Sequence, residues 1–380
     1  MKVVIAIDSF KGSLTSLEAG EAIKEGILNA AEAEIIIKPL ADGGEGTTEA
    51  LIEGLSGEAV RLCVKGPLGN RIEAAYGYIE HTKTAVIEMA AAAGIVLVKE
   101  REKNPMEATT YGVGEMIKDA IGKGCRDFII GIGGSATNDG GIGMLTALGY
   151  EFFDEEQNQL GFGGKDLGKI SFISDKNAMP ELKECHFKVA CDVTNPLCGA
   201  NGATYVYGPQ KGVTKEMLEL LDQGMGVYAD ATKKLYQEDY TQTPGAGAAG
   251  GLGFAFLSYL KGELYSGVDL VVNALNLEES IKDADYVITG EGRIDFQTAM
   301  GKAPVGVGKL AKKYGAVVIA LAGCVAEGAE KCNEAGIDSY YSILTNPVSL
   351  EEAMEKKTAR GNLVKTTEQI FRLIASVKPS

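Results

Sequence analysis

A glycine-rich loop at residues 131–143 is the segment whose residue types point most directly to chemistry. It reads GIGGSATNDGGIG and follows the apolar stretch at 127–130. Glycines lack Cβ atoms, so several backbone N–H groups can converge on one anion, and the backbone can take up positive φ where a turn needs it. Ser135, Thr137 and Asn138 add hydroxyl and amide donors. The loop therefore predicts a binding site for a phosphate or a carboxylate.

Two other interpretations of this loop stay open. GIGGSA fits the fingerprint of a dinucleotide-binding loop, with Asp154 about 20 residues further on, although that fingerprint usually opens the first unit of a sheet. A purely structural turn is the other. A phosphate loop is favoured because Asp139 is expected to begin a helix, whose positive end attracts anions. A Walker loop is excluded, since no GxxxxGK precedes Ser or Thr. The predicted nucleotide-binding residues are Gly133, Gly134, Ser135, Thr137, Asn138 and Asp139.

Four further loops place acids, amides and single cations directly after predicted strands. They are DSFKGSL (8–14), ADGGEGT (41–47), CDVTNPL (191–197) and GEGRIDFQT (290–298). The carboxyl ends of parallel strands form the ligand-binding edge of open α/β sheets. Each acid taken singly can also be a plain turn or cap residue, because turns need only Gly, Asn or Asp. The coincidence of four such loops predicts phosphoryl transfer.

A fifth glycine-rich segment, TPGAGAAGGLGFAF at 243–256, leaves two interpretations open. Its glycines either approach a nucleotide ring or a phosphate, or they let a helix pack closely against a sheet. The residue types fit both equally well.

The elements that position these loops follow from the texture of the chain. Continuous apolar runs that alternate with helical segments predict a parallel, buried sheet. The predicted strands are VVIAI (3–7), EIIIK (34–38), DYVITG (285–290), AVVIALAG (316–323) and SYYSILT (339–345), with a helix at 15–31 between the first two. The segment GPLGNRIEAAYGYIE at 66–80 is instead typical of a hairpin. We therefore predict an α/β protein in which residues 1–60 and 281–380 form one doubly wound parallel sheet, and residues 61–280 form a second α/β domain inserted into it.

Composition narrows the class of partner. The formal net charge is -15, with 52 acidic against 37 basic residues, which argues against a nucleic-acid polymer as partner. Seven cysteines without a CxxC pair, and only two histidines, indicate neither a zinc cluster nor a disulfide framework, so we expect reduced thiols and a cytoplasmic protein. The first residues lack the layout of a secretory signal, and the longest apolar stretch, at 89–98, is too short to span a bilayer. No membrane partner is expected.

Taken in chain order, six motifs resemble those of the type I glycerate kinases of bacteria. They are DSFKGSL, ADGGEGT, GIGGSATNDGG, CDVTNPL, GAGAAGG and GEGRIDFQT, and the resemblance covers almost the whole chain. It implies ATP-dependent phosphorylation of D-glycerate, commonly on the 2-hydroxyl, by a Rossmann-like domain with a flavodoxin-like domain inserted into it. A kinase that forms 3-phosphoglycerate, a nicotinamide-dependent oxidoreductase and a non-catalytic two-lobe binder of small acids are the alternatives.

Both substrates of such a kinase are anions, so an acidic protein needs local cations to attract them. An arginine can hold the glycerate carboxylate through two parallel hydrogen bonds, which favours Arg293 or Arg71 over a lysine. The predicted substrate-binding residues are Ser9, Arg71, Glu291, Arg293, Gln297 and Lys302.

The transfer step itself needs few groups from the protein. A carboxylate must accept the hydroxyl proton, and charge neutralisation and positioning do the rest. Asp192 and Asp295 are the candidate bases, and Lys11 joins them in the predicted catalytic set. Asp8 and Asp42 are expected to hold Mg²⁺ directly or through water.

Overall fold

The chain folds into two compact units. The structure is a computed structural model that describes residues 1–44 and 46–377. Glu45, the second acid of the ADGGEGT loop, lies outside the described residues. Unit 1 comprises Met1–Asp42, Glu49–Ser56 and Val271–Ser380, and unit 2 comprises Gly43–Thr48 and Gly57–Leu270. That they are separate domains with boundaries near residues 60 and 280 stays a prediction.

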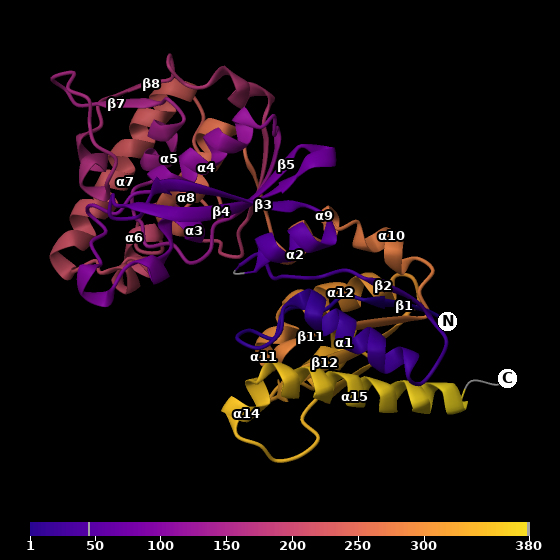
Figure 1. The fold of residues 1–380 in the computed structure, drawn as a ribbon. Helices are drawn as coiled ribbons and strands as arrows, with labels where there is room; N and C mark the ends of the chain where they lie inside the picture. The colour runs from indigo at the N-terminus through magenta and orange to yellow at the C-terminus, as the bar shows by residue number, and fades with distance from the viewer. Residues whose placement is uncertain (45, 378–380) are drawn as a thin grey trace. The chain divides into compact units, whose positions relative to one another are not determined.

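Unit 1 is built on a five-stranded parallel sheet with the strand order β13-β12-β11-β1-β2. The strands are β1 (Lys2–Ile5), β2 (Glu34–Ile37), β11 (Tyr286–Ile294), β12 (Val317–Val325) and β13 (Ser339–Ser342). Val3 of the first strand lies opposite Ile35 on one side and Tyr286 on the other. The predicted pairing of the two ends of the chain in one doubly wound sheet is confirmed (Figure 1).

Helices cover both faces of this sheet. They are α1 (Ser16–Leu28), α10 (Leu277–Ile281), α11 (Phe296–Ala299), α12 (Ala303–Lys312), α13 (Lys331–Glu334), α14 (Leu350–Met354) and α15 (Lys356–Val377). The helices α1 and α15 pack against each other on one face, whereas α12 packs on β11 and β12 from the other (Figure 1). Right-handed crossovers require this distribution when the strand order runs outward from β1 in both directions.

The order of strands in unit 1 assigns its topology. Counted along the chain it is 2-1-3-4-5, the order of flavodoxin, whereas the Rossmann order is 3-2-1-4-5-6. The flavodoxin-like topology therefore lies in the discontinuous unit, and not in the inserted one where the resemblance placed it. The α/β class predicted for both units is confirmed.

Unit 2 has a mixed six-stranded sheet in the order β10-β9-β6-β5-β4-β3. The strands are β3 (Glu58–Lys65), β4 (Arg71–Ile79), β5 (Thr84–Glu88), β6 (Asp127–Gly131), β9 (His186–Ala190) and β10 (Glu263–Tyr265), and a separate antiparallel pair joins β7 (Glu151–Phe153) to β8 (Phe172–Ser174). From β5 to β10 the strands are parallel, whereas β3 and β4 form the predicted hairpin.

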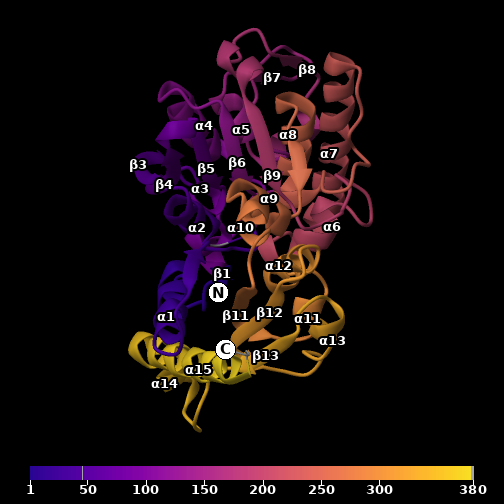
Figure 2. The same cartoon turned by 90° about the vertical axis from the view of Figure 1, so that its right-hand side faces the viewer.

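The helices of unit 2 surround that sheet. They are α3 (Ala90–Ala93), α4 (Tyr111–Gly122), α5 (Ile142–Ala147), α6 (Ala203–Tyr207), α7 (Lys215–Tyr236) and α8 (Ala248–Leu260). Short 3₁₀ helices lie at Glu80–Thr82, Ile95–Leu97, Glu100–Glu102, Gly164–Lys169, Pro180–Glu184 and Pro209–Lys211. The helix α4 packs on the hairpin and on β5, and α8 packs on β9 and β10 (Figure 2). In α2 (Thr47–Gly54) and α9 (Gly267–Ala274) the chain passes from one unit to the other.

Local sequence explains where the first helix begins. Thr15 Oγ1 accepts from the Glu18 N–H and the Glu18 carboxylate accepts from the Thr15 N–H, both at 3.2 Å, which forms a capping box. The helix was predicted over 15–31 and is observed at Ser16–Leu28. Its buried side, with Ile23 and Ile27, faces the core of unit 1.

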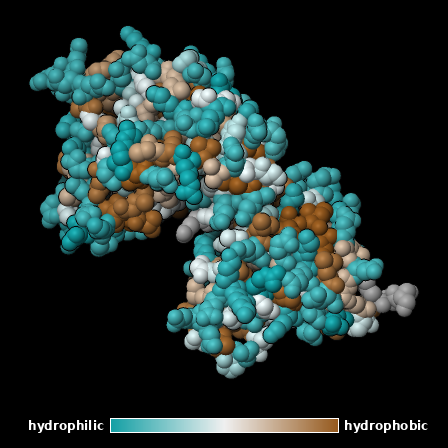
Figure 3. Space-filling model, viewed as in Figure 1, coloured by the Kyte–Doolittle hydropathy of each residue, from teal (hydrophilic) through white to brown (hydrophobic). Residues whose placement is uncertain are grey.

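Hydrophilic residues cover most of the face shown in Figure 3, with scattered apolar patches on each unit. Within residues 1–44 and 46–377, no helix is both long and apolar enough to cross a membrane.

Candidate active site

The strand-end loops of unit 1 meet at one edge of its sheet. Since β1 lies between β2 and β11, the residues that follow or end these three strands become neighbours. The Asp8 N–H donates to the Gly290 carbonyl at 3.0 Å, and Lys11 Nζ lies 3.7 Å from Asp42 Oδ2. Three motifs that are far apart in the sequence are thereby brought together, as the strand-end argument predicted.

Acidic side chains crowd at this edge. Asp8 is 6% exposed, and burial raises the pKa of its carboxyl to about 7. The negative charges of Asp42 and Glu291 raise this pKa further, while the Ser9 N–H, 2.6 Å from Asp8 Oδ1, and the Lys11 ammonium lower it. When the carboxyl groups at this edge are ionised, they attract cations.

Cations lie among these acids. Lys302 Nζ is 3.5 Å from Glu291 Oε2, and the Thr298 hydroxyl donates to Glu291 Oε1 at 2.6 Å. Burial raises the pKa of Glu291, and both of these neighbours oppose that rise. Arg293, whose side chain is 65% exposed, has its Nε 3.2 Å from Asp295 Oδ2. The guanidinium and the two lysines can thus meet an anionic substrate without leaving a buried charge unpaired.

Asp295 has a structural task as well as the predicted catalytic one. It is the N-cap of α11, where its Oδ1 accepts from the Gln297 N–H at 2.9 Å. Its own N–H donates to the Thr298 hydroxyl at 3.2 Å. Gln297 itself is exposed on the first turn of this helix. A substitution at Asp295 must preserve the cap if it is to report on chemistry.

In unit 2, the glycine-rich loop follows β6 and presents backbone rather than side chains. Gly133 and Gly134 are exposed, and Gly134 has φ of +71°. Ser135, Thr137 and Asn138 are buried, with Thr137 and Asn138 fully so. Amides of the two glycines are the groups at the surface that suit an anion.

Asp139 supports the loop from within. It is fully buried, and its Oδ2 accepts from the Thr110 N–H at 2.7 Å and from the Thr110 hydroxyl at 2.8 Å. Its Oδ1 accepts from the Gly141 N–H at 3.1 Å. The helix expected near Asp139 begins at Ile142. These bonds fix the loop to the start of α4. Asp139 therefore supports the loop from its buried side, whereas the predicted ligand would meet the exposed side.

The GAGAAGG segment packs closely against this loop. Ala249, Gly250 and Gly251 all have positive φ, and a Cβ atom on Gly250 would lie 2.1 Å from the Thr137 carbonyl oxygen. The Gly140 N–H donates to the Gly250 carbonyl at 2.9 Å. Close packing is thus observed at Gly250, whereas an approach of this segment to a nucleotide stays a prediction.

Sequence reasoning missed Lys211, the buried lysine beneath the loop. It ends the 3₁₀ helix Pro209–Lys211 and is 2% exposed. Its Nζ donates to Ser135 Oγ and to the Thr137 carbonyl, both at 2.7 Å. A lysine between a proline and a glycine normally indicates an exposed turn, so the sequence carries no signal for this contact.

Two predicted residues lie elsewhere in unit 2. Asp192 follows β9, and its Oδ1 accepts from the Gly267 N–H at 2.9 Å. Arg71 begins β4, where its guanidinium donates to Glu115 Oε1 at 2.7 Å. Arg293 is thus the one of the two candidate arginines that lies among motif residues.

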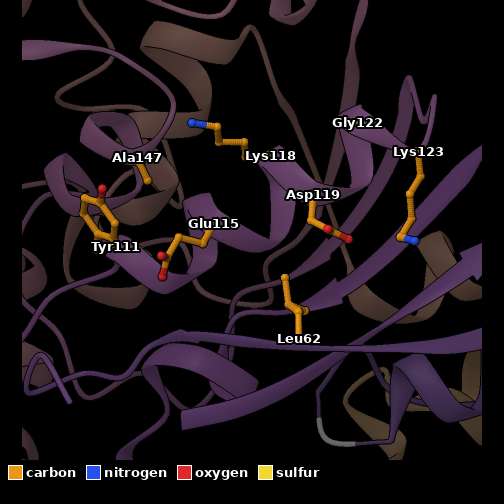
Figure 4. Close-up of a pocket in the computed structure, with 8 residues that line it drawn as sticks. All are labelled: Leu62, Tyr111, Glu115, Lys118, Asp119, Gly122, Lys123 and Ala147. Carbon is orange, nitrogen blue, oxygen red and sulfur yellow. The ribbon is translucent and has the colours of Figure 1, made fainter. Parts of the chain in front are cut away.

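Glu115 also lines a surface hollow of about 650 Å³ between α4 and β3, shown in Figure 4. The residues around it are Leu62, Tyr111, Glu115, Lys118, Asp119, Gly122, Lys123 and Ala147. None of them belongs to the six motifs. This hollow is therefore no part of the predicted site.

A magnesium site can be tested against the same residues. In the described part of the chain, no three or more His, Cys, Asp or Glu side chains converge as a metal-binding group. Mg²⁺ in phosphoryl transfer is usually held by one or two carboxylates together with substrate phosphates, so a pair is sufficient. Asp8 and Asp42 supply oxygen ligands of the right kind, and the charge of Asp42 acts on Asp8.

Comparisons with known proteins agree with this geometry. Residues 3–375 match the glycerate kinase family. The chain is 45% identical to glycerate 2-kinase of Escherichia coli K12 over 376 residues, which covers 99% of this chain and 98% of that one. It is 46% identical to glycerate kinase of Bacillus subtilis 168 over 356 residues, 93% of each chain. A crystal structure of a protein assigned as glycerate kinase 2, from Salmonella typhimurium LT2, superposes with a TM-score of 0.91 at 42% identity, covering 99% of this chain and 98% of that one.

Two α/β units with polar and glycine-rich loops at the carboxyl ends of parallel strands define an enzyme of the phosphotransferase class. The chain belongs to the glycerate kinase family. As a glycerate kinase, it uses a nucleotide and a small-molecule acceptor as its substrates. The oxidoreductase and the solute binder kept open above find no support in these matches.

Titration of Asp8 predicts how stability depends on pH. The folded state binds this proton more tightly than the unfolded chain, so the stability it contributes is full below pH 3.8 and is lost as the pH rises through about 7. Asp8→Asn resembles the protonated carboxyl. We therefore compare the unfolding free energy of Asp8→Asn with that of the wild type at each pH. Since one pKa unit corresponds to about 1.4 kcal/mol, we expect the variant's advantage over the wild type to be on the order of 2 kcal/mol larger at pH 8 than at pH 5. Urea unfolding in EDTA at both pH values measures this, and equal gains would contradict it.

Proposed function

We propose that the protein transfers the γ-phosphoryl group of ATP to the 2-hydroxyl of D-glycerate and forms 2-phosphoglycerate. The observation that carries this proposal is the convergence of acids and cations from three separate motifs at the sheet edge of unit 1, with Asp8, Lys11 and Glu291 at its centre. The name of the Escherichia coli relative, glycerate 2-kinase, supports the 2-position over the 3-position. The thiols are free at all seven cysteines, which supports the cytoplasm as the compartment.

Arg293 is the residue we propose for the glycerate carboxylate. Its exposed, planar guanidinium suits a two-point contact, and its ion pair with Asp295 leaves donors for a second partner. Lys11 and Lys302 would offset the negative charge that builds up on the transferred group. Ser9 and Gln297 add polar contacts at the same edge.

The proton of the attacking hydroxyl needs an acceptor. Asp295 is proposed for this task because it lies beside Arg293, so a substrate held by the arginine would have its hydroxyl near this carboxylate. Asp192 is the alternative base. It ranks second because its Oδ1 already accepts a hydrogen bond from the Gly267 N–H.

Mg²⁺ is proposed at Asp8 and Asp42. When bound, the ion would neutralise phosphate charge and align the reacting groups. Burial and the neighbouring carboxylates raise the pKa of Asp8, and a divalent cation would favour its ionised form.

For the nucleotide phosphates, we propose the exposed amides of Gly133 and Gly134. Their position after β6 corresponds to the ligand edge of the parallel part of the unit 2 sheet. Ser135, Thr137, Asn138 and Asp139 would shape the loop from its buried side.

A substitution at Gly134 tests this assignment. Valine at φ of +71° is strained, because L-residues with branched side chains avoid this region, and its side chain would stand where the phosphate approaches. We expect Gly134→Val to raise the Kd for MgADP at least about tenfold while the fold persists, since only Ala90 Cβ, 3.7 Å away, lies near a Cβ at this position. Calorimetric titration measures the change.

Gly69→Val is the matched control. Gly69 has φ of +85° in the β3–β4 turn, and no atom lies within 4 Å of a Cβ placed there. It carries the same backbone strain away from the six motifs. Equal MgADP affinity in both variants would remove the loop from the nucleotide site.

The reaction itself is tested by product analysis. Purified protein, D-glycerate and MgATP should yield 2-phosphoglycerate by ³¹P and ¹H NMR. Formation of 3-phosphoglycerate would overturn the regiochemistry alone, and absence of ATP-dependent product would overturn the proposed function.

A further inference from the structure

We propose that Lys211 is a positioning residue of the nucleotide loop, whose buried amino group fixes the Ser135–Thr137 backbone and, in its protonated form, supplies a positive charge that stabilises the bound nucleotide phosphates. This inference rests on the proposed function and deepens it. Its observations come from unit 2 alone and concern a residue that none of the six motifs contains.

The first observation is how Lys211 is held. Lys211 is 2% exposed, and both hydrogen bonds of its Nζ, to the Ser135 hydroxyl and to the Thr137 carbonyl, go to neutral groups. Burying a charge without a hydrogen-bonded counter-ion is costly, so such a residue is seldom kept for stability alone. The contact spans 76 residues of sequence and pins the loop directly behind Gly133 and Gly134.

The second observation is that the loop is incompletely satisfied around this lysine. Thr137 Oγ1 and Asn138 Oδ1 are buried and have no hydrogen-bond partner within the described structure. A loop kept only as a turn would normally pair such atoms, because an unpaired buried polar group costs about 1–3 kcal/mol. The polar groups here are arranged for something besides the fold.

The charges around Lys211 leave its positive charge uncompensated. Asp139 is the acid that acts on it, but both Asp139 oxygens are engaged by Thr110 and Gly141. From the other side, Lys103 donates to the Gln210 carbonyl at 3.0 Å and is itself paired with Glu100. The phenol of Tyr207, on the neighbouring helix α6, donates to Asn195 Oδ1 at 2.6 Å and supplies no negative charge here. An anion at the exposed loop glycines would therefore be the main stabilising partner of this ammonium.

This arrangement gives a measurable coupling. Burial lowers the pKa of Lys211 to about 7, and Asp139 opposes the change. At pH 8 the free protein thus holds this amine mostly neutral, and a bound phosphate favours its protonated form. Binding of a nucleotide should then take up a proton at pH 8, and the affinity should fall as the pH rises above 7.

Calorimetric titration of the full chain with MgADP tests the proposal. Titrations at pH 8 in buffers of different ionisation enthalpy give the number of protons taken up. The wild type should take up a substantial fraction of one proton, whereas Lys211→Met should take up none and should bind MgADP at least about tenfold more weakly. In kinetics, the KM for ATP should rise while the KM for glycerate stays constant.

Lys103→Met is the matched control. It removes a neighbouring lysine that contacts the same 3₁₀ helix, and its proton uptake and MgADP affinity should equal those of the wild type. A shift in this control as large as that in Lys211→Met would overturn the proposal, because it would reflect general loss of charge or packing.

The wild type provides a test that does not depend on a variant that folds. Absence of proton uptake by the wild type at pH 8 would overturn the proposal, even if Lys211→Met fails to fold. A folded Lys211→Met protein with unchanged affinity and uptake would also overturn it. If either result is obtained while the wild type still phosphorylates glycerate with ATP, the proposed function stands and only the role of Lys211 fails. If the wild type lacks that activity, the proposed function itself fails.

Discussion

Asp295→Asn is expected to lower kcat by a factor of about 10² to 10⁴ while both substrates still bind, since this is the usual contribution of a general base. Asparagine keeps the size of the side chain and is a good N-cap, so α11 should persist. It cannot accept the hydroxyl proton. Steady-state kinetics with separate binding titrations of glycerate and MgATP will separate turnover from binding.

Asp192→Asn is the matched control for this experiment. Asp192 also follows a strand and accepts a backbone N–H, so its substitution makes the same chemical change in a similar setting. Loss of turnover in the Asp192 variant alone would transfer the role of base to that residue. Loss in neither would mean that positioning and Mg²⁺ suffice, since a loose transition state demands little early deprotonation. Weak glycerate binding in Asp295→Asn would make Asp295 an orienting group beside Arg293.

Gly250→Ala is expected to destabilise the protein by about 2–5 kcal/mol. A φ of +69° costs an alanine about 1–2 kcal/mol, and overpacking adds about 1–3 kcal/mol because the new Cβ would lie 2.1 Å from the Thr137 carbonyl oxygen. The same displacement would disturb the acceptor of Lys211, so MgADP affinity should fall too. Urea unfolding and calorimetric titration provide the two measurements.

The control for this glycine is Gly226→Ala. Gly226 lies inside α7, and no atom lies within 4 Å of a Cβ placed there. Alanine in a helix interior is favoured over glycine, so this variant should gain about 0.5–1 kcal/mol and keep wild-type affinity. If Gly250→Ala were as stable as the wild type, the close packing of the GAGAAGG segment against the loop would not matter to the fold.

Much of the fold was predictable because its signals are local. A buried parallel strand must be apolar on both faces, so runs such as VVIAI and AVVIALAG identify themselves without reference to the rest of the chain. The first helix carries its own start signal in Thr15 and Glu18. Topology is less local, and for this reason the strand orders of the two sheets, among them the flavodoxin-like order of unit 1, became clear only from the pairing.

The candidate site divides in the same way. Placing polar loops after strands was enough to predict that Asp8, Lys11, Asp42 and Glu291 gather, because parallel strands end at one edge. The sequence also identified the glycine-rich loop, since glycine takes up positive φ readily and has no side chain to cover its amide.

Burial, in contrast, depends on segments that are distant in sequence. Asp139 turned inward because Thr110 and Gly141 supply its donors, and Arg71 was drawn to Glu115. Lys211 became the cation beneath the loop only because the 3₁₀ helix at Pro209–Lys211 packs there. The residue types and their order thus determined which loops carry chemistry. Long-range packing decided which side chains face a ligand and which support them from the buried side, because no local sequence pattern records contacts between distant segments.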